Sequence, residues 1–148
     1  MICQDMSIAR RTRLYHKLQL AAHRVQKSGD LTVRAASGLT TAQASVLSII
    51  ATLPKASQKD VANQLGLNES AVTAMVSRLI SDNLVSRERD TADKRSWLLS
   101  LTSHGEEKLS AVAAPFSDIN GKMETCLSEQ EVRTLAELLQ RLSDSFEG

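Results

Sequence analysis

The sequence predicts a mainly α-helical chain with one small β-hairpin past its middle. Apolar residues recur every three or four positions through most of the 148 residues, which is the period of an amphipathic helix. Residues 84–101 depart from this period, with two short runs in which the alternation typical of strands appears. Aromatic residues make up only 3% of the chain, so the core must be built mainly from aliphatic side chains.

The first predicted helix spans residues 8–27, where apolar positions have helical spacing. Gly29 and Gly38 are expected to bracket a looser stretch after it. Thr40 then opens a capping-box pattern, in which two side chains satisfy backbone N–H groups at the start of a helix. That helix is expected to end at Pro54, because proline cannot continue the hydrogen-bond ladder.

Two short helices joined by a tight turn are predicted between Ser57 and Asn83. Gly66 ends the first helix and Asn83 the second, since both residue types tolerate left-handed backbone. Asn68 is a suitable cap for the second helix. Helices that cross steeply need a small residue where they touch, and Ala62 supplies it. This arrangement is typical of a helix-turn-helix.

Two strand-like runs follow, Leu84–Arg89 and Ser96–Leu101, joined by a charged loop. One interpretation is a solvated surface turn. The other is a wing beside the helix-turn-helix, in which Asp93 braces the loop while Lys94 or Arg95 reaches a phosphate or the narrow minor groove of DNA. The helix pair before this hairpin favours the wing.

The second helix of the pair would expose small polar side chains and one cation. Short donors and acceptors suit a helix that must enter a major groove about 12 Å wide. An ordinary helix pair ending in a surface loop is the alternative, and the charged hairpin favours DNA binding over it. The residues expected to contact DNA are Ser57, Gln58, Asn68, Ser70, Thr73, Ala74, Ser77, Arg78, Arg89, Lys94 and Arg95.

Two further helices are predicted after the hairpin. Ser103 to Glu106 has a capping-box pattern, and the long helix after it is expected to kink where Pro115 and Gly121 interrupt it. Ser128 starts the last helix.

The first helix and the last two carry apolar stripes too extensive for one small core to cover, which predicts a homodimer. Net charge is +5 over residues 1–36 and −5 over residues 98–148, so these segments would also attract each other. The alternative is that all three helices pack within one chain. The residues expected at the dimer interface are Ile8, Leu14, Leu18, Val132, Leu135, Leu139, Leu142 and Phe146.

Three segments, Ser70–Arg87, Asp90–Arg95 and Leu101–Gly105, together resemble the MarR family of winged helix-turn-helix transcriptional regulators. The resemblance covers nearly the whole chain. It implies that Asn68–Asn83 is the recognition helix and Arg87–Trp97 the wing, with the wing arginine entering the minor groove.

The family architecture implies one structural domain with three regions. Residues 1–36 would be an N-terminal dimerisation helix, residues 37–102 the winged helix-turn-helix and residues 103–148 the C-terminal dimerisation helices. Asn83 departs from the family's usual glycine, and Thr91–Ala92 replaces the usual wing proline, which predicts a more mobile tip.

These features predict a sequence-specific DNA-binding regulator that acts as a homodimer on a pseudo-palindromic operator. The resemblance adds repression and a small aromatic or phenolic effector. The alternative is a winged-helix protein-interaction module without specific DNA binding, which the weak net charge of +1 supports. No phosphate loop, nucleophile elbow or metal-ligand spacing is found, so no enzyme activity, cofactor or metal is expected.

The chain has no apolar run typical of a signal peptide or a membrane span, so a cytoplasmic location is expected. Cys3 and Cys126 are expected to be an incidental thiol and a half-buried one rather than a redox sensor.

Overall fold

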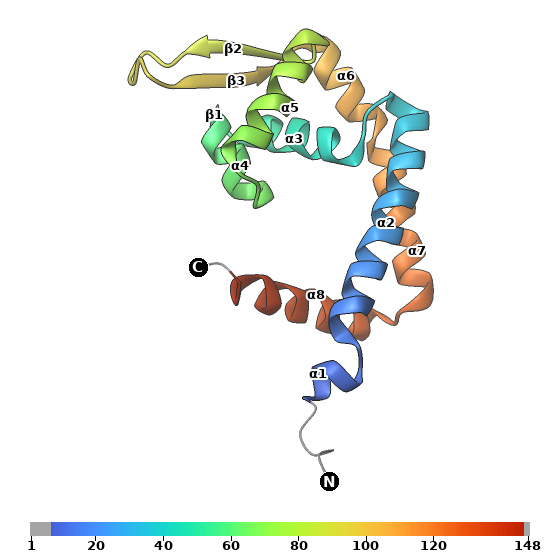
Figure 1. The fold of residues 1–148 in the computed structure, drawn as a ribbon. Helices are drawn as coiled ribbons and strands as arrows, with labels where there is room; N and C mark the ends of the chain where they lie inside the picture. Colours follow the sequence, from blue (N-terminus) through green and yellow to red (C-terminus); the bar gives the residue numbers. More distant parts are fainter. Residues whose placement is uncertain (1–6, 147–148) are drawn as a thin grey trace.

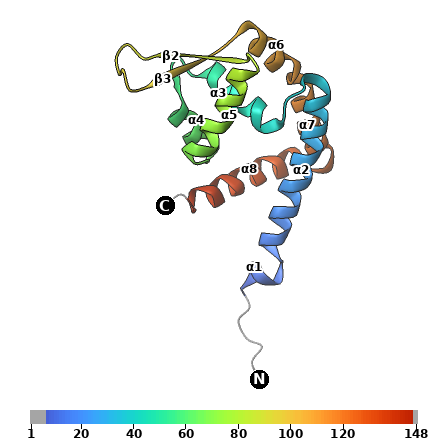
Figure 2. The ribbon, with the colours of Figure 1, turned by 45° about the horizontal axis from the view of Figure 1, so that its top comes forward.

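The computed structural model describes residues 7–146, which form a helical lobe with a small sheet and a long helical arm (Figure 1). In chain order the elements are α1 (Ile8–Arg11), α2 (Leu14–Ser37), α3 (Thr41–Thr52), β1 (Ala56–Ser57), α4 (Gln58–Leu65), α5 (Glu69–Ser81), β2 (Val85–Arg89), β3 (Trp97–Leu101), α6 (Ser103–Ala111), α7 (Ala113–Cys126) and α8 (Glu129–Asp144). We call α3 to α6 with the sheet the lobe, and α1, α2, α7 and α8 the arm. In the arm, α2 runs beside α7, and α8 points away from the C-terminal end of α7 (Figures 1 and 2).

The predicted hairpin is confirmed, and it belongs to a three-stranded antiparallel sheet of order β1-β3-β2. Val85 pairs with Leu101 and Arg89 with Trp97. The additional strand β1 lies on the other edge of β3, where Ala56 pairs with Leu99. Strand β1 could not be predicted from the sequence, because two residues are too few to show an alternating pattern.

The core lies almost entirely in the lobe. It is aliphatic, as the composition predicts, and it fills the space between α3, α4, α5 and the sheet. Its buried members are Val33, Leu39, Ala44, Val46, Leu47, Ile50, Ala56, Val61, Ala62, Val72, Val76, Leu79, Leu84, Val85, Leu99 and Val112.

The helix ends of the lobe follow the predicted local chemistry. Thr40 and Gln43 make the capping box of α3, and Ser57 opens α4 in the same way with Asp60. Gly66 ends α4 in left-handed backbone at φ +62°, a conformation without strain for glycine. Asn83, after α5, adopts φ +57° as predicted.

The N-terminal helix differs from the prediction. It breaks at Arg13, which has left-handed backbone (φ +54°), and α2 then continues without interruption to Ser37. The looser stretch expected after Gly29 is therefore wrong. Gly29 is buried inside α2, and a Cβ there would lie 3.1 Å from Ile119 Cδ1 of α7. This glycine permits close helix packing instead of ending a helix.

The predicted long helix after the hairpin is two helices, α6 and α7, which meet at Val112. Pro115 explains the break, because it cannot donate to the carbonyl of Ala111, the last residue of α6. Gly121 causes no interruption, so that part of the prediction is wrong. The capping box expected from Ser103 is also wrong, since Thr102 Oγ1 caps α6 by accepting from Gly105 N at 3.0 Å.

Gly105 is required by close backbone contact rather than by φ. A Cβ at this position would lie 2.0 Å from the carbonyl oxygen of Leu84, so only glycine lets α6 start against the segment that joins α5 to β2. Thr102 closes the same junction by donating to Asn83 O at 2.6 Å.

The last helix, α8, begins at the predicted capping box of Ser128 and Glu131. It buries none of its residues within the chain. Cys126, expected to be half-buried, is exposed instead, and Cys3 lies outside the described residues. None of the helices within residues 7–146 is long and apolar enough to cross a membrane.

Candidate nucleic-acid interface

Helix α5 presents one face to the core and the opposite face to solvent. Val72, Val76 and Leu79 are completely buried against α3, α4 and the sheet. Their spacing leaves the predicted contact residues pointing outward. All of these are exposed, namely Asn68, Ser70, Thr73, Ala74, Ser77 and Arg78. Apart from Arg78, the predicted contact residues on this face have small or short side chains, which leave room for it to approach a groove.

Two hydroxyl groups on this face already donate their protons within the chain. Thr73 Oγ1 donates to the carbonyl of Glu69 at 2.7 Å, and Ser70 Oγ donates to Asn68 Oδ1 at 2.7 Å. Each oxygen keeps a lone pair, so in this arrangement Thr73 and Ser70 can only accept a further hydrogen bond. Asn68 also accepts from Ala71 N at 2.8 Å, as a helix cap should.

The start of α4 offers less to an external partner. Ser57 Oγ donates to Asp60 Oδ2 at 2.6 Å and accepts from Asp60 N at 3.1 Å. Ser57 N also donates to Asp60 Oδ2, at 2.9 Å. The bonds that the Ser57 hydroxyl and then the Ser57 N–H donate to this carboxylate lower its pKa. Ser57 and Gln58 are both half-buried. The structure thus gives Ser57 a capping role, and only part of Gln58 is accessible.

The loop between β2 and β3 is folded on itself. Asp93 accepts from Arg95 N and from Ser96 Oγ, each at 3.0 Å, which is the geometry that its predicted bracing role needs. Asp90 Oδ1 accepts from Ala92 N at 2.9 Å. Both carboxylates are therefore occupied by the loop itself, while the side chains of Lys94 and Arg95 are exposed at its tip.

The loop end of this hairpin carries a cation–π stack that was not predicted from the sequence. The guanidinium groups of Arg87 and Arg89 lie 4.8 and 4.2 Å from the centroid of the Trp97 ring. Arg89 also donates to the carbonyl of Lys94 at 2.7 Å, so it holds the loop as well as facing solvent. In the sequence, the two arginines occupy alternate positions of one predicted strand and Trp97 lies on the other. The stack could be predicted from this pattern only if the register of the two strands were known.

Comparison with known proteins identifies the chain. The model of the MarR family matches residues 39–97. The HTH-type transcriptional repressor MdtR of Bacillus subtilis (strain 168) is 32% identical over 110 residues, which cover 74% of this chain and 71% of that protein. The chain belongs to the MarR family.

Solved MarR-like structures share the fold over nearly the full chain. The PcaV transcriptional regulator of Streptomyces coelicolor, solved with its natural ligand, is 26% identical and superposes with a TM-score of 0.78 over 99% of this chain and all of that one. Sco3205, a MarR family transcriptional regulator of the same organism solved in complex with DNA, is 20% identical. Its TM-score is 0.88, with 97% of this chain and 95% of that chain covered. The winged helix-turn-helix fold predicted from sequence is confirmed.

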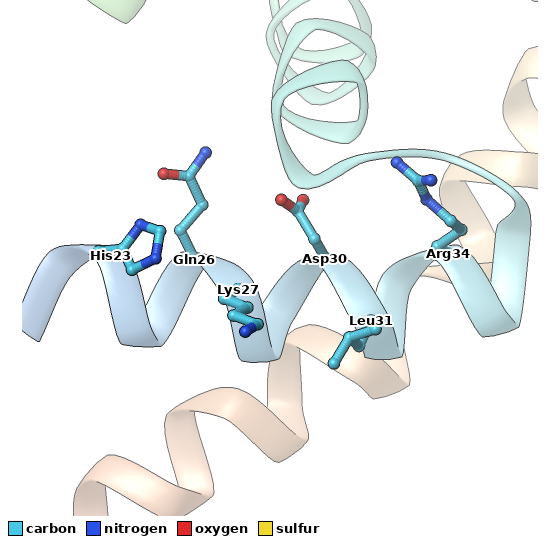
Figure 3. A pocket seen from close by; sticks show the side chains of 6 residues that line it. All are labelled: His23, Gln26, Lys27, Asp30, Leu31 and Arg34. Carbon is cyan, nitrogen blue, oxygen red and sulfur yellow. The ribbon is translucent and has the colours of Figure 1, made fainter.

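On the arm, a pocket of about 350 Å³ lies along α2 (Figure 3). Its lining combines basic groups with one carboxylate and one apolar side chain: His23, Gln26, Lys27, Asp30, Leu31 and Arg34. Among the described residues, no three His, Cys, Asp or Glu side chains gather closely enough to hold a metal ion. Tyr15 is exposed on α2 and does not line this pocket.

Proposed function

We propose that this MarR family chain represses transcription by binding a pseudo-palindromic DNA operator as a homodimer. The observation that carries the proposal is the joint exposure of the small polar face of α5 and the wing-tip cations Lys94 and Arg95 on one lobe. A helix for the major groove and a basic loop for the backbone or minor groove are the two elements that a winged reader needs.

Thr73 is the residue we assign to base reading. Because its hydroxyl proton is bonded to Glu69 O, it offers an acceptor and a methyl group. The acceptor suits the exocyclic amino group of adenine or cytosine, and the methyl suits the thymine methyl. Ser77 lies one turn further along the same face and would extend the reading to a neighbouring base pair.

Arg95 is the residue we assign to sequence-independent binding. Asp93 accepts a hydrogen bond from Arg95 N, so the guanidinium projects from a loop that is held by its own hydrogen bonds. A cation held in this way releases counterions when it meets DNA, and its contribution falls as salt rises. Arg78, on the edge of the α5 face, would lie nearer the phosphates than the bases.

The test compares three variants in DNA titrations at several salt concentrations. We expect Arg95→Ala to weaken binding to many sequences by on the order of 1–3 kcal/mol and to make the salt slope shallower. Thr73→Ala should relax preference at one or two positions of each half-site and leave the slope nearly unchanged. Lys122→Ala is the matched control, because it removes an exposed cation from α7.

Unchanged affinity and slope for Arg95→Ala would show that the wing makes no DNA contact. Absence of steep salt dependence in the wild-type protein would instead favour the alternative, a protein-interaction module.

The homodimer is supported by the exposed apolar side chains of the arm. Ile8 is 72% exposed in the single chain, Leu14 49%, Leu135 44% and Leu139 41%. Such surface is normally covered in a stable protein, and a two-fold partner covers both copies at once. Leu18, Val132, Leu142 and Phe146 belong to the same proposed interface.

We further propose that a small aromatic or phenolic effector weakens DNA binding. The pocket along α2 supports an acidic compound, because the basic side chains of Lys27, Arg34 and His23 line it with Leu31 and outnumber its one carboxylate, Asp30. A ligand acts only if it prefers one arrangement of the two recognition helices over another. A screen of phenolic acids for loss of operator binding tests this, with Lys27→Ala as the variant expected to lose the response.

A further inference from the structure

A side chain of the arm holds the first residue of the lobe. Asp30 lies on α2, and its Oδ1 accepts from Thr41 N at 2.7 Å and from Thr41 Oγ1 at 2.6 Å. Figure 3 shows Asp30 pointing from α2 toward the segment that leads into α3. A carboxylate at a helix N-terminus makes charge-assisted bonds and also interacts favourably with the helix dipole.

The helix end does not need this bond in order to form. Thr40 Oγ1 accepts from Gln43 N at 3.1 Å, and Gln43 Oε1 accepts from Thr40 N at 3.0 Å. This local capping box starts α3 by itself. The hydrogen bonds that Thr41 donates to Asp30 therefore connect α2 with α3 at a helix end that is already capped.

Thr41 is held from a second side as well. A Cβ at Gly29 would lie 3.2 Å from Thr41 Cγ2, so the threonine methyl packs directly on the α2 backbone. Threonine is branched at Cβ and stiff about χ1. Thr41 donates hydrogen bonds from its hydroxyl and its N–H to Asp30, and its methyl group packs on Gly29. These contacts fix the position of Thr41 relative to α2.

The covalent link between α2 and α3 is short and has one unusual residue. Gly38, the residue after α2, has φ +78°, a conformation that glycine adopts freely. The chain changes direction between α2 and α3 (Figures 1 and 2). Rotation about the Gly38 backbone would change the orientation of the lobe relative to the arm. The contact of Asp30 with Thr41 lies beside this turn and opposes such rotation.

We propose that Asp30 is a positioning residue for DNA recognition: through Thr41 it sets the angle between arm and lobe, and so the separation of the two recognition helices. The inference rests on the proposed function, a dimer that reads two half-sites. Asp30 itself lies on the arm, and its effect on DNA binding passes through α3. The hydrogen bonds from Thr41 hold the pKa of the Asp30 carboxyl below its usual range, so it is ionised at neutral pH.

The experiment measures how strongly the full-length protein prefers one half-site spacing. Duplexes carry the selected half-sites at the selected spacing and with one base pair inserted or removed. One base pair shifts a half-site by about 3.4 Å and rotates it about the DNA axis. We expect the wild-type protein to lose at least about tenfold in affinity on the altered duplexes, since its recognition helices are held at a fixed separation.

Asp30→Ala should reduce this spacing preference to about threefold or less, because the lobes can then adjust to either duplex. Asp30→Asn keeps an acceptor oxygen in the same place and should recover part of the preference. Thr41→Val keeps the methyl but loses the hydroxyl donor, and it should lie between wild type and Asp30→Ala. Combining Thr41→Val with Asp30→Ala should add nothing further.

Thr40→Ala is the matched control, since it removes the local cap from the same end of α3 and leaves Asp30 bonded to Thr41. It should lower stability and keep the spacing preference. A full wild-type preference in both Asp30→Ala and Thr41→Val would overturn the assignment while leaving the proposed function intact. Wild-type protein that binds no two-half-site duplex, or binds all spacings equally, would overturn the assignment together with the proposed dimeric reader.

Discussion

The lobe and the arm differ in how much of their apolar surface one chain covers. The buried aliphatic residues run from Val33 to Val112 and belong almost wholly to the lobe. Helices α1 and α8 bury no residue at all, and α7 buries only Pro115. The reading surface is thus built on a core that a single chain completes, whereas the arm presents apolar side chains that a second chain would cover.

This difference separates two properties of a DNA reader. Which bases are read depends on α5 and its wing, which rest on the core of one chain. How far apart the two readings lie depends on the arms, which would meet in the dimer. Substitutions in the lobe and in the arm should therefore have different effects.

The largest effect is expected at the glycine where α6 meets the recognition helix. Gly105→Ala places a Cβ 2.0 Å from Leu84 O, and the backbone must move to relieve the contact. We expect a loss of about 3 kcal/mol in the free energy of unfolding, measured by chemical denaturation. Gly121→Ala in the arm meets nothing within 4 Å and should raise helix stability by up to about 1 kcal/mol. Equal changes in the free energy of unfolding for Gly105→Ala and Gly121→Ala would contradict the difference between lobe and arm.

The next effect concerns association. Leu139 is 41% exposed in the single chain, and Leu139→Glu would bury a charge at the proposed interface twice in a symmetric dimer. The dimer dissociation constant should rise by at least about 100-fold, as measured by sedimentation. Gln140→Glu introduces the same side chain at the adjacent, exposed position and should change the dimer dissociation constant little. A dimer unaffected by Leu139→Glu would exclude α8 from the interface.

The sequence predicted best what is decided locally. The caps at Thr40, Ser57, Asn68 and Ser128 and the left-handed residue Asn83 all follow from neighbours within four positions. The buried face of α5 follows from its helical period. The same local reasoning also placed the predicted DNA-contact residues of α5 on an exposed face.

Contacts between residues far apart in the chain could not be predicted from the sequence. Gly29 looked like a helix end, yet it lies inside α2 because α7 packs closely there. Asp30 gave no signal, because its partner Thr41 is eleven positions away on another helix. The Arg87–Trp97 stack needed the strand register, which periodicity alone does not supply.

The smallest effect is a pH dependence within the lobe. Ser57 lowers the pKa of Asp60 in the folded chain, so the ionised carboxylate stabilises the fold above its unfolded pKa of about 3.9. This contribution is lost as pH falls through the lowered folded pKa. We expect Asp60→Asn to flatten the acid decline of unfolding free energy by under about 1 kcal/mol, because the group is well solvated.

Glu131 provides the comparison in the arm. Ser128 lowers the pKa of its carboxyl in the same way, so its contribution has the same sign. Helix α8 rests on no core of its own chain. Glu131→Gln should therefore leave the acid decline of the lobe, followed by Trp97 fluorescence, unchanged. A larger change for Glu131→Gln than for Asp60→Asn would contradict the division into two regions.

The most direct test of a dimeric two-site reader is to select bound duplexes from a random pool and then measure the mass of the complex on the enriched sequence. We predict two inverted half-sites with centres about 10 base pairs apart, occupied by two copies of the chain. Enrichment of no sequence, or of a single half-site carrying one copy, would contradict the account.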